Sequence, residues 1–377
     1  MGVTSSGLLI GVGPQGQLPL PWLGEGLARA RALTQAHALL AHGPAGVGQL
    51  EFCLLLAQAW LCERPAAPAA GQGLGAGQGA ACGHCESCHL VRSRSHPDLL
   101  VVLPEALRLQ IGWADDDEKP KGEAKPSREI RITQLREAID WAQRTSGRGR
   151  AKVLLIHPAD AMNGPTANAL LKTLEEPPGQ LRIVLGSADP ERLLPTVRSR
   201  CQRVPLALPP AEQAAAWLRA QGLAEPGPLL ALAGGSPLEA LALAAEGLTP
   251  EVLAELPRRV AAGDPAPLQG RPIPRVVELL LKLAHDAMAL AVGGAPRHFA
   301  AASLPVGGDL AALVAWQQAL LRAARHDEHP WNAGLLIESL VGQAAAAWPV
   351  APRGAQRGER PAPGAHGGGR ASLHSAR

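Results

Sequence analysis

A short apolar stretch, a glycine-rich turn and a long apolar stretch follow one another between residues 37 and 61. Residues 37–40 predict a buried strand that ends in the turn GPAGVG, and residues 49–61 predict a helix. Because that helix is apolar on nearly all sides, the rest of its domain should cover it. The order of strand, turn and helix indicates the start of an α/β domain.

The alternation of strands and helices continues along the chain. Strands are predicted at residues 152–157, 182–187 and 202–208, and helices near residues 133–145 and after Pro165. Such alternation predicts a mostly parallel sheet flanked by helices. After Pro210 no strand pattern recurs, and Ala and Leu at helical spacing up to about Trp348 predict an all-α remainder.

The expected fold is therefore an α/β module followed by helical domains. We place the module at residues 20–208, a small helical lid at 209–262, a larger helical bundle at 263–348 and a disordered tail at 349–377. Two stretches inside the module are expected to be loops, because residues 65–80 are small and residues 104–128 mix many charges. Residues 327–338, which include Trp331, are expected to form a subunit interface.

Composition narrows the class of protein. The 377 residues are 46% apolar, rich in Ala and Leu and without Tyr, which favours helices over an all-β fold. A formal charge of +3 is too small to indicate a nucleic-acid binder by itself. We expect no secretory signal in residues 1–22, which carry no basic residue before their apolar run, and no membrane span in residues 276–292, which include Glu278, Lys282 and Asp286. The chain is therefore expected to be cytoplasmic.

Cysteine spacing gives the strongest signal for a site. In a cytoplasmic chain, cysteines are more often metal ligands or core residues than disulfides. Cys82, Cys85 and Cys88 stand at two successive CxxC spacings, and Cys62 is the nearest candidate for a fourth ligand, with His84 and His89 as rivals. Four thiolates complete the tetrahedral shell of zinc and leave no open position, so the site would be structural.

The turn of residues 43–50 has the glycines and the length of a phosphate-binding P-loop but lacks its chemistry. Gly43 and Gly48 are in place, whereas Gln49 stands where a lysine would neutralise phosphates and Leu50 stands where a hydroxyl would hold magnesium. The strand at 152–157 ends in His157 instead of the acidic residues that hold magnesium and orient water. The sequence predicts a nucleotide fold that has lost hydrolysis.

Three segments carry a resemblance to a known family. MNGPTANALLKTLEEPP, RIVLGSADP and LLPTVRSRC resemble the core of the AAA+ clamp-loader subunits of bacterial DNA polymerase III, and Ser199, Arg200 and Cys201 resemble the SRC motif of that family. Within the family, a degenerate P-loop together with a four-cysteine knuckle resembles the delta-prime branch and differs from the ATP-hydrolysing gamma/tau subunits.

The resemblance implies a role in DNA replication. It implies a RecA-like AAA+ module with a zinc knuckle inserted at residues 62–88, followed by the helical lid and by a helical collar domain for oligomerisation at 263–348. It also implies a stator that hydrolyses no ATP and has no polymerase activity of its own. The implied partners are the gamma/tau and delta subunits and, through the complex, the sliding clamp and primed DNA. Arg200 is implied to be an arginine finger that acts in trans on the ATP of a neighbouring subunit, the alternative being a surface arginine at a helix end. Leu238 stands where an active member would carry a sensor arginine.

Two other functions belong to different classes. An active AAA+ ATPase or helicase motor would need phosphate and magnesium ligands that Gln49, Leu50 and His157 do not offer. A zinc-dependent DNA-binding protein would need a basic element that reads bases beside the knuckle, and residues 82–88 contain none. Cys53 and Cys201 are expected to be core residues.

Overall fold

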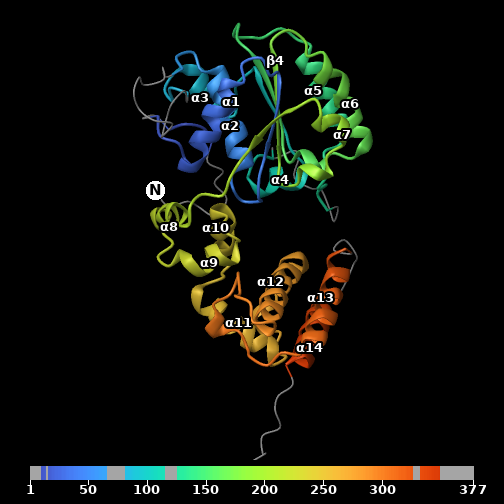
Figure 1. Cartoon of the computed structure of the whole chain (residues 1–377). Helices are drawn as coiled ribbons and strands as arrows, with labels where there is room; N and C mark the ends of the chain where they lie inside the picture. The colour runs from blue at the N-terminus through green and yellow to red at the C-terminus, as the bar shows by residue number, and fades with distance from the viewer. Residues whose placement is uncertain (1–9, 14–15, 66–80, 115–124, 326–331, 349–377) are drawn as a thin grey trace, which may run out of the picture.

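The computed structural model describes residues 10–13, 16–65, 81–114, 125–325 and 332–348. The predicted tail, Trp331 and most of the small-residue stretch lie outside these ranges. A sheet with helices on both faces forms the N-terminal part of the molecule, and a helical part hangs below it (Figure 1). We therefore confirm the coarse prediction of an α/β part followed by an all-α part.

Five parallel strands make up the sheet, in the order β2-β3-β4-β1-β5. The strands are β1 (Ala38–His42), β2 (Leu99–Val102), β3 (Lys152–Ile156), β4 (Leu181–Ser187) and β5 (Gln202–Pro205). Because β1 lies between β4 and β5, the chain leaves β1 toward one side of the sheet and leaves β4 toward the other. The glycine turn that follows β1 thus lies where the connections diverge, the usual place of a ligand site in open α/β sheets.

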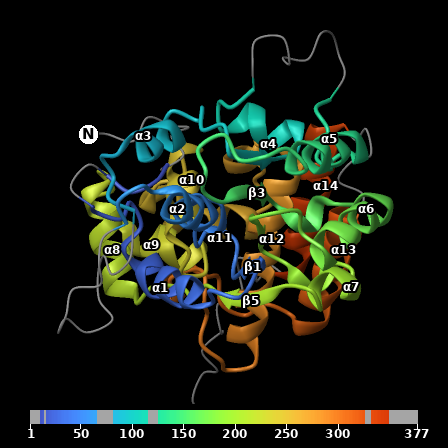
Figure 2. The same cartoon turned by 90° about the horizontal axis from the view of Figure 1, so that it is seen from above.

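Helices cover the sheet in two layers. Side chains alternate along β1, so that Leu39 and Ala41 join one hydrophobic cluster and Ala38 and Leu40 join the other. The first cluster packs α1 (Gly24–Ala32), α2 (Gln49–Leu61) and α3 (Glu86–Arg92), and the second packs α5 (Ile132–Ala142), α6 (Gly164–Glu175) and α7 (Pro195–Arg198). Figure 2 shows the two layers on opposite sides of the strands.

Helix α2 has the bounds that its sequence predicts. It begins after Gly48, whose φ of 100° is a left-handed conformation that favours glycine, and it ends at Cys62 in an extended conformation. Twelve of its 13 side chains are buried, as expected for a helix that is apolar on nearly all sides. Burial also raises the pKa of Glu51 on this helix to about 7.

Two elements differ from the sequence prediction. Strand β2 was not predicted, and residues 104–128 are not a loop throughout, because Glu105–Gln110 form helix α4. The ends of this stretch are tied together, since the Ala106 N–H donates to the Ser127 carbonyl over 3.0 Å and the Ser127 N–H donates to Oε2 of Glu105 over 3.2 Å. The many charged side chains of this stretch predicted a solvated loop, but they give no signal for these backbone contacts.

The helical part contains α8 (Ala211–Ala220), α9 (Pro226–Leu232), α10 (Pro237–Ala245), α11 (Pro250–Ala261), α12 (Ile273–Ala291), α13 (Leu310–Ala324) and α14 (Ala333–Ala347). Trp217 of α8 links the helical part to the segment that precedes α1. Its Nε1 donates to the Pro19 carbonyl over 3.0 Å, and its ring meets that of Trp22 edge-on. Helix α11, which the sequence prediction assigns to the lid, packs against α14. The boundary between lid and collar stays a prediction.

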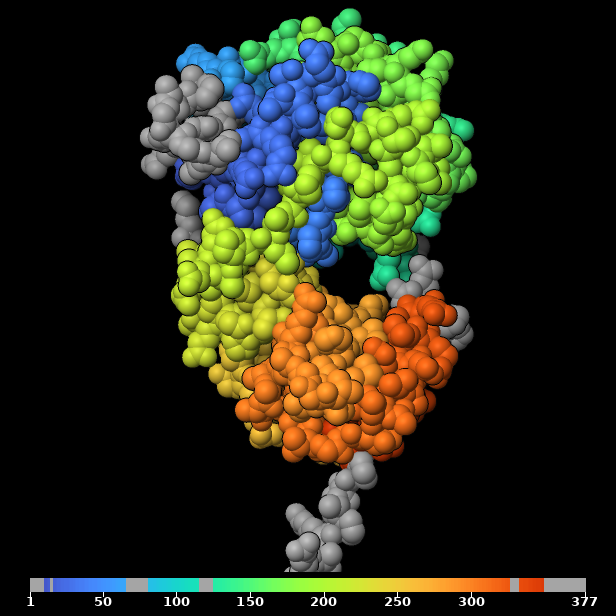
Figure 3. Space-filling view, viewed as in Figure 1, coloured from blue at the N-terminus to red at the C-terminus, as the bar shows by residue number. Residues whose placement is uncertain are grey.

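A hollow of about 820 Å³ separates the sheet-bearing part from the helices below (Figure 3). Its lining includes Pro44 and Ala45 of the glycine turn, Gln110 after α4, and Arg275 of α12. Arg275 also pairs with Glu239 and Glu246, which joins α12 to α10 on the wall of this hollow. Among the described helices none alone is both long and apolar enough to cross a bilayer, and α9 and α10 meet that test only together across a bend of 108°.

Gly186 of β4 allows a close approach that a larger residue would block. A Cβ there would lie 2.6 Å from Nδ1 of His157 and 3.2 Å from Sγ of Cys53. We expect Gly186→Ala to lower the free energy of unfolding by about 1–3 kcal/mol through overpacking, measured by chemical denaturation. Gly342→Ala, where nothing lies within 4 Å of the added Cβ, is the matched control and should be neutral or slightly stabilising. Equal stability of the two variants would contradict the packing argument.

Candidate functional site

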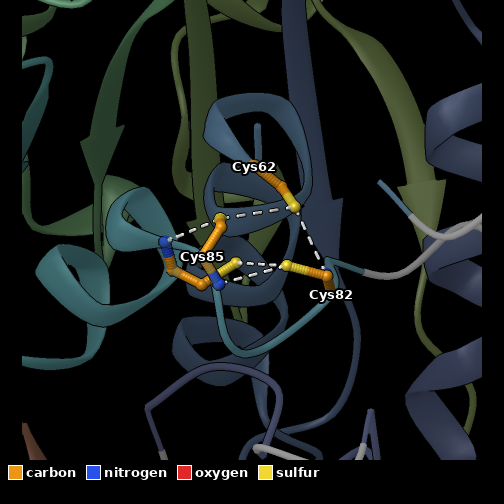
Figure 4. Close-up of side chains that lie close together, drawn as sticks. Cys62, Cys82 and Cys85 are labelled. Atoms are coloured by element: carbon orange, nitrogen blue, oxygen red, sulfur yellow. Dashed lines mark hydrogen bonds between the residues drawn. The ribbon is translucent and has the colours of Figure 1, made fainter. Parts of the chain in front are cut away.

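Four cysteines come together at the C-terminal end of α2. Cys62 ends α2, Cys82 and Cys85 belong to the following turn, and Cys88 lies on α3. Figure 4 shows the sulfur atoms of Cys62, Cys82 and Cys85 directed toward one another. The Sγ atoms of Cys62 and Cys85 are 3.9 Å apart, as are those of Cys82 and Cys88.

This geometry fits a zinc ion. Four sulfurs at about 2.3 Å from a tetrahedral metal lie roughly 3.8 Å from one another. Backbone N–H groups also point at the sulfurs, with Cys82 N 3.2 Å from Sγ of Cys62 and Cys85 N 3.3 Å from Sγ of Cys82. Burial raises the pKa of Cys62 and of Cys88, and a bound cation would favour the thiolate form of these two groups.

The rival histidine ligands lie outside the cluster. His84 is exposed and its Nδ1 lies 2.8 Å from the Cys82 carbonyl, and His89 is exposed on α3. Another group of potential ligands, which the sequence did not suggest, is formed by His285, Asp286 and His298. The Asp286 carboxylate already accepts N–H bonds from Arg297, His298 and Phe299, so we assign it to fixing that loop on α12.

The glycine turn is filled by the side chain that replaces the P-loop lysine. Nε2 of Gln49 donates to the carbonyls of Gly43 and Pro44, each over 2.7 Å. Gln49 and Leu50 are both buried. Gly43 is needed because a Cβ there would lie 2.3 Å from the Leu206 carbonyl oxygen. The Gln49 amide thus satisfies two backbone carbonyls of the turn and adds no charge to it.

Donors from other elements bind the remaining carbonyls of the turn. Oγ of Ser236 donates to the Ala45 carbonyl over 2.6 Å, and the Leu238 N–H donates to the Gly46 carbonyl over 3.2 Å. Nε1 of Trp22 donates to the Val47 carbonyl over 2.8 Å. The start of α10 is therefore bonded directly to the turn, and Leu238 reaches it through its backbone, since its side chain carries no charge.

His157 follows β3, at the position where an ATP-hydrolysing protein with a P-loop would carry an acidic residue. Burial lowers its pKa to about 4, so the ring is neutral near pH 7, and its Nδ1 lies 3.2 Å from the Gly186 carbonyl. Asp160, three residues later, accepts a hydrogen bond from Oγ of Ser187 over 2.6 Å. His157 thus offers no carboxylate at the end of β3, and one carboxylate oxygen of Asp160 is bonded to Ser187.

Arg200 lies after α7, with a side chain that is 33% exposed. Its Nε donates to Oε1 of Glu175 over 2.7 Å, its Nη2 contacts the same oxygen, and its Nη1 donates to the Thr196 carbonyl over 2.9 Å. Ser199 Oγ donates to the same Thr196 carbonyl, whereas Cys201 is buried, which raises the pKa of its thiol to about 12. Cys53 is buried as well.

Sequence reasoning did not foresee the pairing of Arg200 with Glu175. The structure brings Glu175 to Arg200 because α6 and α7 pack against each other. The partners are 25 residues apart in the chain, so no spacing rule connects them. Lys172, one turn earlier on α6, is exposed.

Part of the chain is similar to known proteins. A family model described as "DNA polymerase III, delta subunit" matches residues 28–210. A DNA polymerase III subunit delta' of Pseudomonas aeruginosa is 40% identical over 220 residues, which are 56% of this chain and 57% of that protein. Residues 28–210, somewhat under half of the chain, are thus similar to the delta and delta' subunits of DNA polymerase III.

A second curated relative carries the same subunit name. A subunit delta' of Escherichia coli is 34% identical over 231 residues, 59% of this chain and 60% of that protein. The chain thus spans somewhat more than half the length of these curated relatives. A solved gamma subunit-related protein of Thermotoga maritima is 16% identical, with a TM-score of 0.43 over 86% of this chain and all of that one, a resemblance too loose to bear on the assignment.

The knuckle predicts one tightly held zinc per chain. We expect Cys62→Ser, Cys82→Ser, Cys85→Ser and Cys88→Ser each to lose zinc and to unfold at lower temperature, because an incomplete shell binds the ion more weakly. Elemental analysis of the purified protein measures the content. Cys201→Ser, outside the cluster, should keep the metal. A folded wild-type protein without metal would refute the site, and zinc retained in Cys62→Ser but lost when His84 or His89 is also changed would identify another fourth ligand.

Proposed function

We propose that the chain is a non-hydrolysing stator of the DNA polymerase III clamp-loader complex. In this role it assembles with gamma/tau and delta subunits and helps them to place the sliding clamp on primed DNA. The observation that carries the proposal is the filled glycine turn, in which Gln49 binds the carbonyls of Gly43 and Pro44. Similarity to DNA polymerase III delta' subunits over part of the chain supports the choice of complex.

The parts of the molecule have distinct roles in this proposal. Residues 20–208 form a RecA-like AAA+ module that carries a structural zinc knuckle, residues 209–262 form the lid and residues 263–348 form the collar. Exposed apolar side chains on α13, at Leu310, Val314 and Leu321, follow helical spacing and support a collar that packs against other subunits. Leu335 on α14 is also exposed, although Trp331 of the predicted interface lies outside the described residues.

Arg200 is the group through which a stator would contribute to catalysis. A guanidinium keeps its charge and offers a planar fork of donors to a transferring phosphoryl group. In the single chain, that fork is held by Glu175 and Thr196. An exposed ion pair contributes only about 0–1 kcal/mol, so Arg200 could leave Glu175 for a nearby γ-phosphate at little cost.

We expect the isolated chain to show no ATPase activity and to bind ATP more weakly than about 1 mM. The reason is that Gln49 supplies no charge and that neither Leu50 nor His157 supplies a magnesium ligand. Isothermal titration calorimetry with Mg-ATP tests binding, and phosphate release tests turnover. Gln49→Lys alone should not create turnover, because magnesium would still lack its ligands. Micromolar ATP affinity of the wild-type chain would contradict the closed turn.

We expect Arg200→Ala to leave assembly and zinc content intact while slowing DNA- and clamp-stimulated ATP hydrolysis by the complex. An arginine finger accelerates its own site by about 10³ to 10⁵, and the loss in the whole complex is smaller because other subunits supply the other fingers. Arg200→Lys should rescue poorly, since an ammonium lacks the planar fork.

Two variants serve as controls for this experiment. Arg192→Ala removes an exposed arginine of the same segment and should leave hydrolysis unchanged. Glu175→Gln removes the charge that holds Arg200 and should leave hydrolysis equal or faster, because the guanidinium loses a competitor for the phosphate. Wild-type hydrolysis and clamp-loading rates in an intact Arg200→Ala complex would exclude the finger and leave Arg200 as a structural partner of Glu175.

A further inference from the structure

The outer edge of β2 is unpaired over a short length. β2 lies at the end of the sheet, and among the described residues it pairs only with β3. The Val153 N–H donates to the Asp98 carbonyl and the His157 N–H to the Val102 carbonyl. Because backbone groups alternate along a strand, the N–H and C=O of Val101 point the other way, toward the open edge.

Two contacts mark the limits of this edge. At one end the Leu99 N–H donates to the His96 carbonyl over 3.1 Å. At the other end Nε2 of Gln134 donates to the Leu103 carbonyl over 3.2 Å. Between them the Leu99 carbonyl and both backbone groups of Val101 face outward, which is room for a short extended segment of another chain.

A groove of about 620 Å³ runs along this edge. Trp141 and Glu137 of α5 line one side, and Arg94 and Trp113 line the other. Figure 2 shows α3, α4 and α5 in a row along this side of the sheet. The walls combine aromatic rings with charged heads, and the floor is a strand edge, so the groove suits a chain that offers both side chains and backbone amides.

A buried side-chain donor beside the groove has no hydrogen-bond partner among the described residues. His96 lines the groove and is only 4% exposed. Its Nδ1 accepts the Asp98 N–H over 3.1 Å, which leaves the proton on Nε2, and Nε2 has no hydrogen-bond partner among the described residues. A buried polar atom without a partner is costly, and a ligand carbonyl or carboxylate in the groove would satisfy it.

Arg94 is held at the rim in a strained conformation. Its φ of 61° is the only positive value of a non-glycine residue in the described chain. It occupies the end of α3, where the Arg94 N–H donates to the Val91 carbonyl and glycine is the usual residue. Its Nη1 donates to the Gly112 carbonyl over 3.1 Å and its guanidinium stacks on Trp113. A strained arginine with a fixed side chain at a groove indicates a binding role.

We propose that the free edge of β2 is a strand-addition site for an extended acidic peptide segment of another protein chain. Val101 exchanges backbone hydrogen bonds with the segment, Nε2 of His96 donates to one of its oxygens, and Arg94 pairs with an acidic side chain. The backbone bonds supply affinity and the charge supplies selectivity, as in other strand-addition complexes. The site is separate from the glycine turn and from Arg200, so it does not depend on the stator role.

The test uses the full-length zinc-loaded protein and a fluorescent heptapeptide in which valine and aspartate alternate, with binding measured by anisotropy. Val101→Pro removes one outward N–H, and an edge position tolerates proline. We expect it to weaken binding by roughly 3- to 10-fold. Val101→Thr keeps the N–H and the branched side chain and should bind as the wild type does. Both variants are first compared with the wild type by circular dichroism and thermal unfolding.

Two further measurements do not require the proline variant to fold. A heptapeptide with N-methyl groups on alternate amides, tested in both registers, should lose binding in one register, because only that set of N–H groups faces β2. Arg94→Gly suits the positive φ and should weaken the valine–aspartate peptide but not its valine–asparagine analogue. Any of three results would overturn the proposal: no binding up to about 1 mM peptide, equal binding of the methylated peptides, or tighter binding of oligo-dT that is unaffected by Val101→Pro.

Discussion

The closed glycine turn is the point at which the parts of this molecule meet. Five successive carbonyls, from Gly43 to Val47, each accept a hydrogen bond from a protein donor. The donors come from Gln49 at the start of α2, from Ser236 and Leu238 at the start of α10, and from Trp22 before α1. Because buried carbonyls must be satisfied, these donors fix the positions of three elements at once. The turn thus connects three parts of the molecule.

Helix α2 connects the glycine turn to the cysteine cluster. The helix starts at the turn with Gln49 and ends at Cys62, and its side chains are almost all buried between the sheet and neighbouring helices. Near its end, Gln58 is fully buried, accepts the Val12 N–H and donates to the Cys88 carbonyl. A metal in the knuckle would therefore stiffen the far end of the same helix that holds the turn. The two sites share one rigid element, although they share no ligand.

The sequence predicted those parts whose pattern is strong and local. Helix α2 was predicted to the residue because apolar side chains fill every turn between Gly48 and Cys62, and the cysteine cluster followed from CxxC spacing. Strand β2 was not predicted, although Leu99–Val102 is an apolar run between two prolines. The many charges that follow this run favoured the prediction of a loop. The contacts of Gln49 with its own turn and of Arg200 with Glu175 depend on how distant elements pack. No periodicity encodes them.

The energies of its two possible partners, Glu175 and a transferring phosphate, decide where the Arg200 guanidinium binds. Their pair is exposed on both sides, with 33% and 50% of the side chains accessible, so solvent screens most of its energy and about 0–1 kcal/mol remains. A finger that accelerates phosphoryl transfer by about 10³ to 10⁵ stabilises the transition state by roughly 4–7 kcal/mol. Arg200 would therefore leave Glu175 and bind the phosphate whenever a neighbouring subunit presents that phosphate. Between encounters Glu175 holds the Arg200 guanidinium in place, and its removal should affect the order of the side chain more than the rate. The two glutamates before the double proline differ in this respect, since only Glu175 reaches the guanidinium among the contacts that the described residues make.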